Sequence, residues 1–164
     1  MRRSLLATTV AVLVLAPLAA GCADDVDHVV LTVSHPPVSS VALTDADPSG
    51  PSAGDVRTIH VEGTDNLGRA VRVDAILTTT AEDVPAAGVE TRVSTIVFTW
   101  VDSGSQLVVQ GSAAYTVDKN VLDENTVVER PLTGGSGEFE GVTGSATSTH
   151  LADDSWTHEL HFDL

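Results

Sequence analysis

The chain has 164 residues, and its 23 Asp and Glu residues outnumber its eight Lys and Arg residues, which gives a formal net charge of −15. A surface of this sign repels polyanions, so the composition argues against nucleic-acid binding and against electrostatic attachment to anionic lipid. The single cysteine excludes an internal disulfide. The length suits one domain with a core of its own.

The N-terminal residues are typical of an export signal. A short basic start, Met1 to Arg3, precedes an apolar run from Leu5 to Ala20. The run is short for a membrane span and is followed at once by acidic residues. We therefore assign residues 1–21 to a signal peptide and residues 22–27 to an acidic tether. Removing residues 1–21 takes away two arginines and no acid, so the formal charge falls from −15 to −17.

Cys22 ends the sequence L-A-A-G-C and resembles the acylated cysteine of a bacterial lipoprotein signal. This resemblance implies lipid attachment at Cys22 and an anchor on the outer side of the cell membrane. The alternative is an ordinary signal peptide that leaves the protein secreted and free.

Residues 28–164 alternate between apolar and polar side chains with a period of two, which predicts β-strands. No sustained helical repeat is present. Short strands joined by turns predict an antiparallel sandwich or a barrel. The second face of several strands is partly apolar, so we expect it to be solvated or to form a homodimer or homotrimer contact. The expected strands span residues 28–34, 57–63, 69–80, 89–101, 106–116, 126–132, 144–152 and 155–164.

Glycine is concentrated in the stretch from Pro131 to Leu151. This density predicts a tight corner rather than a strand or a helix. A phosphate-binding loop is the alternative, but it would need a following helix and usually a lysine, and the only lysine is Lys119. The residues of the corner are Gly134, Gly135, Gly137, Phe139, Gly141 and Gly144.

The sequence G-G-S-G-E-F-E-G-V-T-G of this corner resembles the G-G-T-G-x-F/Y-x-G-x-x-G signature of the allene oxide cyclase-like barrel superfamily. That superfamily includes plant dirigent proteins and spirotetronate-forming cyclases. Residues 50–55, 63–69 and 106–111 resemble further parts of its pattern, and the resemblance covers roughly residues 28–164. It implies an all-β, eight-stranded antiparallel barrel. From the position of Phe139 between the glycines of the corner, we expect its ring to plug the barrel end. The dirigent and plant cyclase site patterns are not matched, so the resemblance implies a fold and no particular chemistry.

A barrel of eight strands can enclose one small apolar ligand. Tyr115, the only tyrosine, would orient a carbonyl or donate a proton from inside the barrel. A buried Arg92 would need Glu62 or Glu90 as its partner. For each of these residues a structural or surface role is the alternative. The catalytic candidates are Tyr115, Arg92 and Glu62; the ligand-binding candidates are Trp100, Phe98, Gln110 and Arg72; Asp74 and Arg130 are further polar candidates.

The six histidines show no metal-ligand spacing. His158 and His161 are separated by an odd number of residues, so they lie on opposite faces of the last strand. We expect exposed histidines, no metal, no cofactor and no covalent nucleophile.

Two classes of function remain. The first is an exported barrel that binds a small apolar molecule or acts as a surface interaction module. The second is a cyclase or isomerase that uses the lumen as a template for its substrate. The contents of the lumen separate these possibilities. A cavity that contains Tyr115 or an Arg–Glu pair favours ligand binding or a cyclase. A lumen filled with apolar side chains excludes ligand binding and cyclisation and leaves a surface interaction module.

Overall fold

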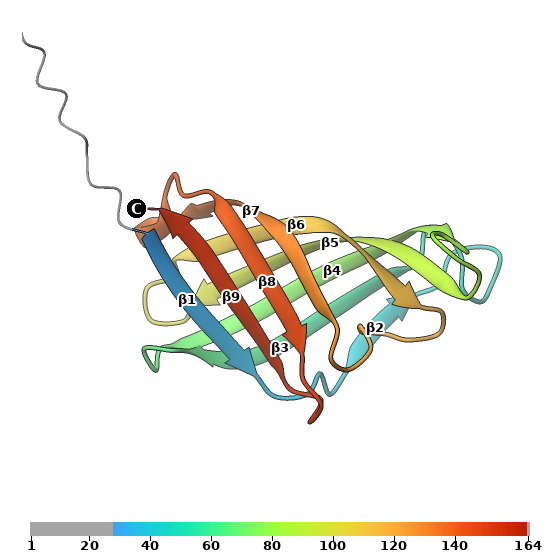
Figure 1. Ribbon diagram of the computed structural model, residues 1–164, viewed down its shortest axis with the longest axis horizontal. Coiled ribbons are helices and arrows are strands. Elements are labelled where there is room, and N and C mark those ends of the chain that lie inside the picture. Colours follow the sequence, from blue (N-terminus) through green and yellow to red (C-terminus); the bar gives the residue numbers. More distant parts are fainter. Residues whose placement is uncertain (1–27, 164) are drawn as a thin grey trace, which may run out of the picture.

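In the computed structural model, residues 28–163 are described and form nine β-strands and one short 3-10 helix (Figure 1). The predicted signal peptide, the tether and Cys22 lie outside the described residues. The strands are β1 (His28–His35), β2 (Val41–Thr44), β3 (Val56–Asp65), β4 (Ala70–Glu82), β5 (Val89–Trp100), β6 (Gln106–Thr116), β7 (Val127–Ser136), β8 (Gly144–His150) and β9 (Trp156–Asp163), and the helix is η1 (Gly137–Phe139).

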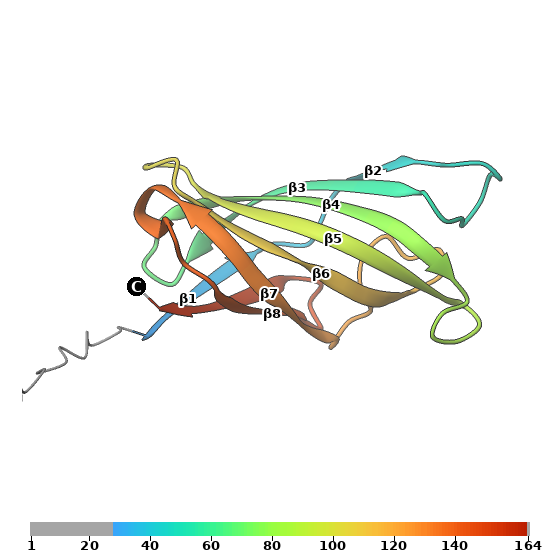
Figure 2. The same cartoon turned by 90° about the horizontal axis from the view of Figure 1, so that it is seen from above.

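Eight of these strands close an antiparallel barrel. The sheet runs in the order β1, β9, β8, β7, β6, β5, β4, β3, and β1 also pairs with β3 through Val33–Asp65 and Ser34–Thr64. The remaining strand, β2, pairs with the first half of β3 outside this closure, where β3 extends away from β1 (Figures 1 and 2). The prediction of an all-β, eight-stranded antiparallel barrel is confirmed, with β2 as an added strand.

The period-two pattern explains which side chains enter the lumen. On β4, Val71, Val73, Ala75 and Leu77 are buried, whereas Ile76 on the opposite face is exposed. On β5 the inward face is the one that carries Glu90, Arg92, Ser94, Ile96, Phe98 and Trp100. Because alternate side chains point to opposite faces of a strand, this face changes from charged to aromatic along the lumen.

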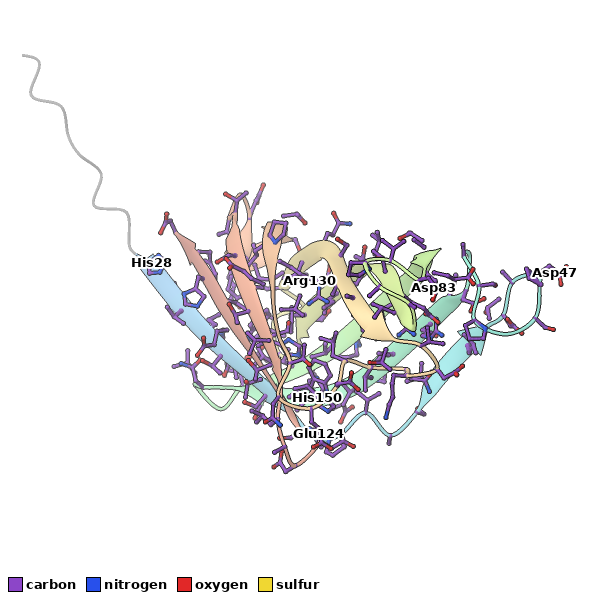
Figure 3. All side chains as sticks on the ribbon, turned by 45° about the vertical axis from the view of Figure 1, so that its right-hand side comes forward. His28, Asp47, Asp83, Glu124, Arg130 and His150 are labelled. Atoms are coloured by element: carbon purple, nitrogen blue, oxygen red, sulfur yellow. The ribbon has the colours of Figure 1, made fainter. Side chains whose placement is uncertain are left out.

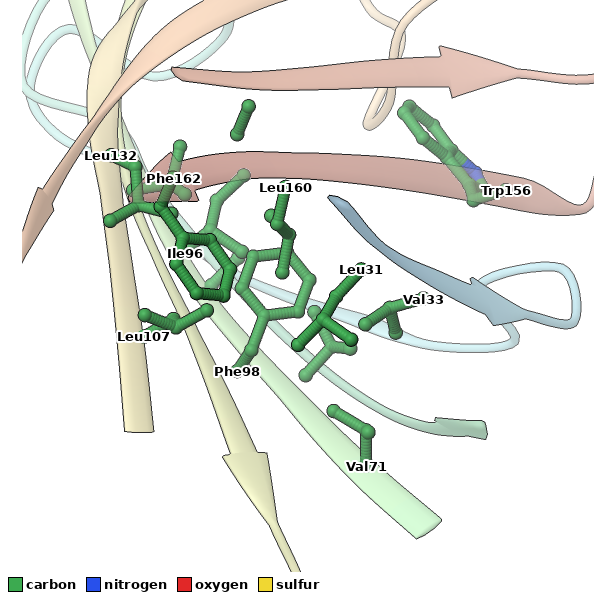
Figure 4. Packing of buried hydrophobic residues seen from close by; sticks show 14 of the residues in the cluster. Leu31, Val33, Val71, Ile96, Phe98, Leu107, Leu132, Trp156, Leu160 and Phe162 are labelled. Atoms are coloured by element: carbon green, nitrogen blue, oxygen red, sulfur yellow. The ribbon is translucent and has the colours of Figure 1, made fainter. Parts of the chain in front are cut away.

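One half of the lumen is packed with apolar side chains (Figure 4). Burying a leucine or phenylalanine side chain stabilises a fold by about 1.5–3 kcal/mol, so this cluster is a major source of stability. Trp156 stands apart from the group, toward the other end of β9. The apolar half contains Leu31, Val33, Val71, Phe98, Leu107, Leu132, Leu160 and Phe162, all 6% exposed or less.

The glycine-rich corner closes the apolar half. β7 continues through Gly134 and Gly135, which pair with Val108 and Leu107 of β6 after a register shift at Thr133 of β7. The expectation that these glycines lie in a turn was therefore wrong, because a β-bulge lets the strand continue. The backbone turns at Gly137 and again at Gly141, whose φ values of +66° and +84° favour glycine.

Phe139 occupies the end of the lumen beside that turn. It is 3% exposed, and its ring lies 4.5 Å from the ring of Trp100 and 5.8 Å from that of Phe162. The corner thus carries an aromatic plug into the barrel end. Within residues 28–163, η1 is the only helix, and a single turn of three residues is far too short to cross a bilayer.

Candidate functional site

The other half of the lumen contains a cavity, hereafter the lumen cavity. The space between its lining atoms is about 520 Å³ including the part that opens to solvent, of which about 60 Å³ admits the centre of a water-sized sphere. A water needs at least about 10–15 Å³ of the latter measure, so several waters or one small molecule fit without rearrangement. The lining residues are His35, Ile59, Val61, Val73, Ala75, Leu77, Ser94, Ile96, Tyr115, Val121, Leu122, Arg130, Ser148, Trp156 and His158.

Small side chains on adjacent strands leave this space empty. Leu77 of β4 pairs with Ser94 of β5, and Ser94 pairs with Gly111 of β6. The missing side chain at Gly111 also makes room for Arg130, since a Cβ there would lie 3.0 Å from Arg130 Cγ. Serine and glycine in the middle of two lumen-facing strands therefore produce the cavity.

Arg130 of β7 and Tyr115 of β6 meet in the cavity wall. Arg130 Nη2 donates a hydrogen bond to Tyr115 Oη over 3.2 Å, and both residues are at most 4% exposed. Arg130 Nε has no hydrogen-bond partner among the described residues, and the side chain forms no ion pair within them. Burial raises the pKa of Tyr115 against the opposing influence of Arg130 and Arg92, so its hydroxyl stays protonated at neutral pH. Because a guanidinium only donates, the hydroxyl hydrogen of Tyr115 is available to a ligand.

His158 and Trp156 of β9 add two further polar atoms to the wall. His158 Nδ1 lies 2.9 Å from Ser148 Oγ, whereas His158 Nε2 and Trp156 Nε1 have no partner among the described residues. Burial lowers the pKa of His158 to about 3, helped by the charges of His35 and Arg130. The imidazole is therefore neutral at physiological pH.

Three histidines are buried, which corrects the expectation of exposed histidines. His35, His150 and His158 are each at most 6% exposed, and their rings stack around Trp156. Each lies on the face of its strand that points into the lumen, and His158 shares this face with Leu160 and Phe162. Their alternation in step with buried apolar residues is the sequence signal that predicts these histidines inside the barrel.

A buried cluster of charged residues adjoins the cavity. Arg92 Nη2 lies 2.8 Å from Glu90 Oε2, and Arg57 Nη2 lies 3.7 Å from the same oxygen. Arg92 also donates to the Lys119 carbonyl over 2.6 Å and lies over the Tyr115 ring at 4.5 Å. Of the two partners expected for Arg92, the structure selects Glu90, and the pair supports Tyr115 from behind rather than lining the cavity.

Several predicted candidates lie away from the lumen cavity. Glu62, Arg72 and Gln110 are exposed on the outer face of the barrel, because they occupy the other parity of their strands. Arg72 pairs there with Asp74 over 3.1 Å, and Gln110 donates to Thr95 over 3.1 Å. Trp100 and Phe98 are buried, but in the apolar half. Tyr115 and Arg130 are thus the candidates that reach the cavity.

Figure 3 shows Arg130 and His150 in the middle of the molecule, between His28 at one end and Asp47 and Asp83 at the other. Among residues 28–163, no group of three or more His, Cys, Asp or Glu side chains is arranged to hold a metal ion. The polar groups of the site are three hydroxyls, a guanidinium, an indole and two imidazoles.

The fold is shared with several solved structures. A pyocyanin demethylase aligns with a TM-score of 0.57 and 15% identity over 82% of this chain and 99% of its own. The pterocarpan synthase dirigent protein GePTS1 aligns at 0.55 and 16% identity over 84% of each chain. The Diels–Alderase AbmU from Streptomyces koyangensis aligns at 0.51 and 17% identity over 87% of this chain and 71% of its own. No protein-family model and no curated protein sequence matches the chain. The chain has the barrel fold of dirigent proteins and Diels–Alderases.

Proposed function

We propose that this protein binds a small, largely apolar molecule in the lumen cavity. The observation that carries the proposal is the contrast between the two halves of the lumen. The apolar half is packed with side chains, whereas the other half contains a cavity lined by buried polar atoms that have no partner among residues 28–163. Leaving a buried donor unpaired costs about 1–3 kcal/mol, so a bound molecule that pairs with these atoms would recover that energy.

Native mass spectrometry of the protein from its own host tests this proposal. We expect an additional mass that is retained in non-denaturing solution and lost on unfolding. Ser94→Leu fills the cavity and should abolish the retained mass, because Ser94 is 1% exposed between Leu77 and Gly111. Ser112→Leu is the matched control, since Ser112 is exposed on the same sheet. Wild-type protein that retains no mass from the host and binds no small probe molecule in solution would contradict the proposal.

A second candidate, a cyclase or isomerase, is favoured by the state of Tyr115. Its hydroxyl accepts a hydrogen bond from Arg130, stays protonated and has a hydrogen available to a bound molecule in the cavity. Such a donor can polarise the carbonyl of a bound substrate, and a preshaped cavity can accelerate a unimolecular cyclisation by holding a reactive conformer. Tyr115→Phe separates the candidates, because it should abolish turnover but only weaken ligand retention.

We further propose export of the chain with a lipid anchor at Cys22, on the basis of the N-terminal sequence. A thioether-linked diacylglyceryl mass on Cys22 in protein from the host would support this assignment. A mature protein that begins after Cys22 would contradict it.

A further inference from the structure

We infer that the ligand of the lumen cavity carries a carboxylate and that Arg130 receives it, an inference that rests on the proposed binding function. The ligand class is a monocarboxylate with a short apolar body. The argument depends on the charge balance inside the barrel, on the arrangement of unpaired polar atoms and on the apolar remainder of the wall.

The charges buried in this half of the barrel do not balance. Glu90 lies within ion-pair distance of both Arg57 and Arg92. The other buried carboxylate nearby, that of Asp55, accepts hydrogen bonds from the backbone of Ala46 and Ser52 and attracts Arg57.

Arg130 is left over. It is 3% exposed, donates a hydrogen bond to the neutral Tyr115 hydroxyl and has no carboxylate partner among the described residues. An unpaired buried charge costs several kcal/mol, which a bound anion would offset. Among residues 28–163, no Asp or Glu lines the cavity, although the chain has a net charge of −15.

The hydrogen-bonding atoms of the wall suit a carboxylate. Arg130 Nε and the Tyr115 hydroxyl hydrogen come from adjacent strands, and Trp156 Nε1 lies on β9. When Ser148 donates to His158 Nδ1, the neutral imidazole carries its hydrogen on Nε2 and becomes a fourth donor. A carboxylate offers about four acceptor sites and no donor, so it complements a set of donors. A neutral carbonyl would satisfy part of this set but would leave the guanidinium charge unpaired.

The remainder of the wall indicates the body of the ligand. Ile59, Val61, Val73, Ala75, Leu77 and Ile96 line the cavity on the side of β3, β4 and β5. These side chains offer no polar atom, and the space beside them is small. A short aliphatic or aromatic group attached to the carboxylate therefore fits this wall best.

Isosteric pairs of probes test the inference. Propionate and propionamide, benzoate and benzamide, and octanoate and octanamide differ in charge but little in shape. Binding is measured by calorimetry at pH 7 to full-length mature protein. At least one carboxylate should bind 10- to 100-fold more tightly than its amide, the range that about 1.5–3 kcal/mol for a hydrogen bond to a charged group implies.

Variants assign the preference to Arg130. Arg130→Gln should remove the preference for the carboxylate, and Arg130→Lys should keep part of it. Arg72→Gln removes an exposed arginine and should leave every affinity unchanged. Circular dichroism and a thermal melt check that each variant folds. If Arg130→Gln does not fold, Arg130→Lys still tests the inference, because its preference for the carboxylate over the amide should be smaller than that of wild type but not absent.

The outcomes separate the inference from the proposed function. Equal binding of a carboxylate and its amide overturns the carboxylate assignment and leaves a ligand-binding barrel. A carboxylate preference that persists in Arg130→Gln overturns the role of Arg130. Absence of binding by all six probes, together with no ligand retained from the host, overturns the proposed function and the inference with it.

Discussion

Trp100 Nε1 donates a hydrogen bond of 2.9 Å to Asp65 Oδ2, and both residues are buried at the apolar end of the barrel. Asp65 also accepts from Arg69 Nε over 2.7 Å, which fixes the turn between β3 and β4. The Trp100 ring also packs against Phe139 of the glycine-rich corner. A single carboxylate thus joins the β3–β4 turn to the aromatic plug, although these segments are far apart in the sequence.

Asp65→Asn should therefore destabilise the barrel by about 2–3 kcal/mol, because it removes the charge from several hydrogen bonds. Burial alone would raise the pKa of Asp65, but the hydrogen bonds from Trp100 and Arg69 outweigh it and lower the pKa. The associated stability is present above the unfolded pKa and is lost as the pH falls through the lower folded value. Urea denaturation at pH 7 and below pH 4 measures both effects, and Glu62→Gln on the exposed face is the control. Equal stability of wild type and Asp65→Asn at pH 7 would contradict this account.

The glycine-rich corner provides a second prediction. A Cβ at Gly144 would collide with the backbone carbonyl oxygen of His161 on β9, whereas a Cβ at Gly134 would meet no atom within 4 Å. Neither position has a positive φ. We expect Gly144→Ala to cost several kcal/mol, comparable with severe overpacking, and Gly134→Ala to cost less than about 1 kcal/mol. The free energy of unfolding measures the difference, and similar costs for the two variants would show that close approach is not the reason for Gly144.

The sequence was sufficient for the fold but not for the site. Alternation on β5 separates the face from Glu90 to Trp100 from the face with Val93 and Val97, but both faces carry apolar residues, so only the closed barrel shows that the first face is inside. On β4 and β7 the alternation is clearer, because Arg72 lies on the face opposite Val71 and Val73 whereas Arg130 shares its face with Leu132. Alternation cannot show that Arg130 lacks an acidic partner among the described residues, because that depends on contacts between strands. The histidines were missed for a related reason: each was treated as a polar residue, whereas tertiary packing stacks His35 and His158 in the wall.

Buried His158 predicts a specific pH dependence. Its pKa is lowered from an ordinary 6.5 to about 3, first by burial and then by the charges of His35 and Arg130. The unfolded chain binds this proton near pH 6.5 and the folded chain does not, so stability is fully present above pH 6.5 and falls as the pH is lowered toward 3. One such group contributes about 1.4 kcal/mol per pH unit.

His158→Gln should reduce the slope of unfolding free energy against pH by this amount between about pH 6 and 4. His35 retains a contribution of the same sign, because burial also lowers its pKa. His60→Gln is the control, since that side chain is exposed and paired with Asp74. Parallel pH profiles for wild type and His158→Gln would show that His158 is protonated in the folded protein.

The two buried arginines beside Tyr115 should respond in opposite ways to the same substitution. Arg92 is paired with Glu90 at 2.8 Å, so Arg92→Met leaves a buried carboxylate with only the more distant Arg57 and should cost about 3–5 kcal/mol. Arg130 has no acidic partner among the described residues, so Arg130→Met removes an uncompensated charge and retains the volume of the stem over Gly111. We expect the ligand-free Arg130→Met protein to be as stable as wild type or more stable by about 1–2 kcal/mol, as is common where a binding group is removed.

Thermal melts of ligand-free protein measure both changes. A carboxylate probe should then raise the melting temperature of wild type but not of Arg130→Met. A large loss of stability in Arg130→Met would mean that the guanidinium is needed by the barrel itself and is not held there for a ligand.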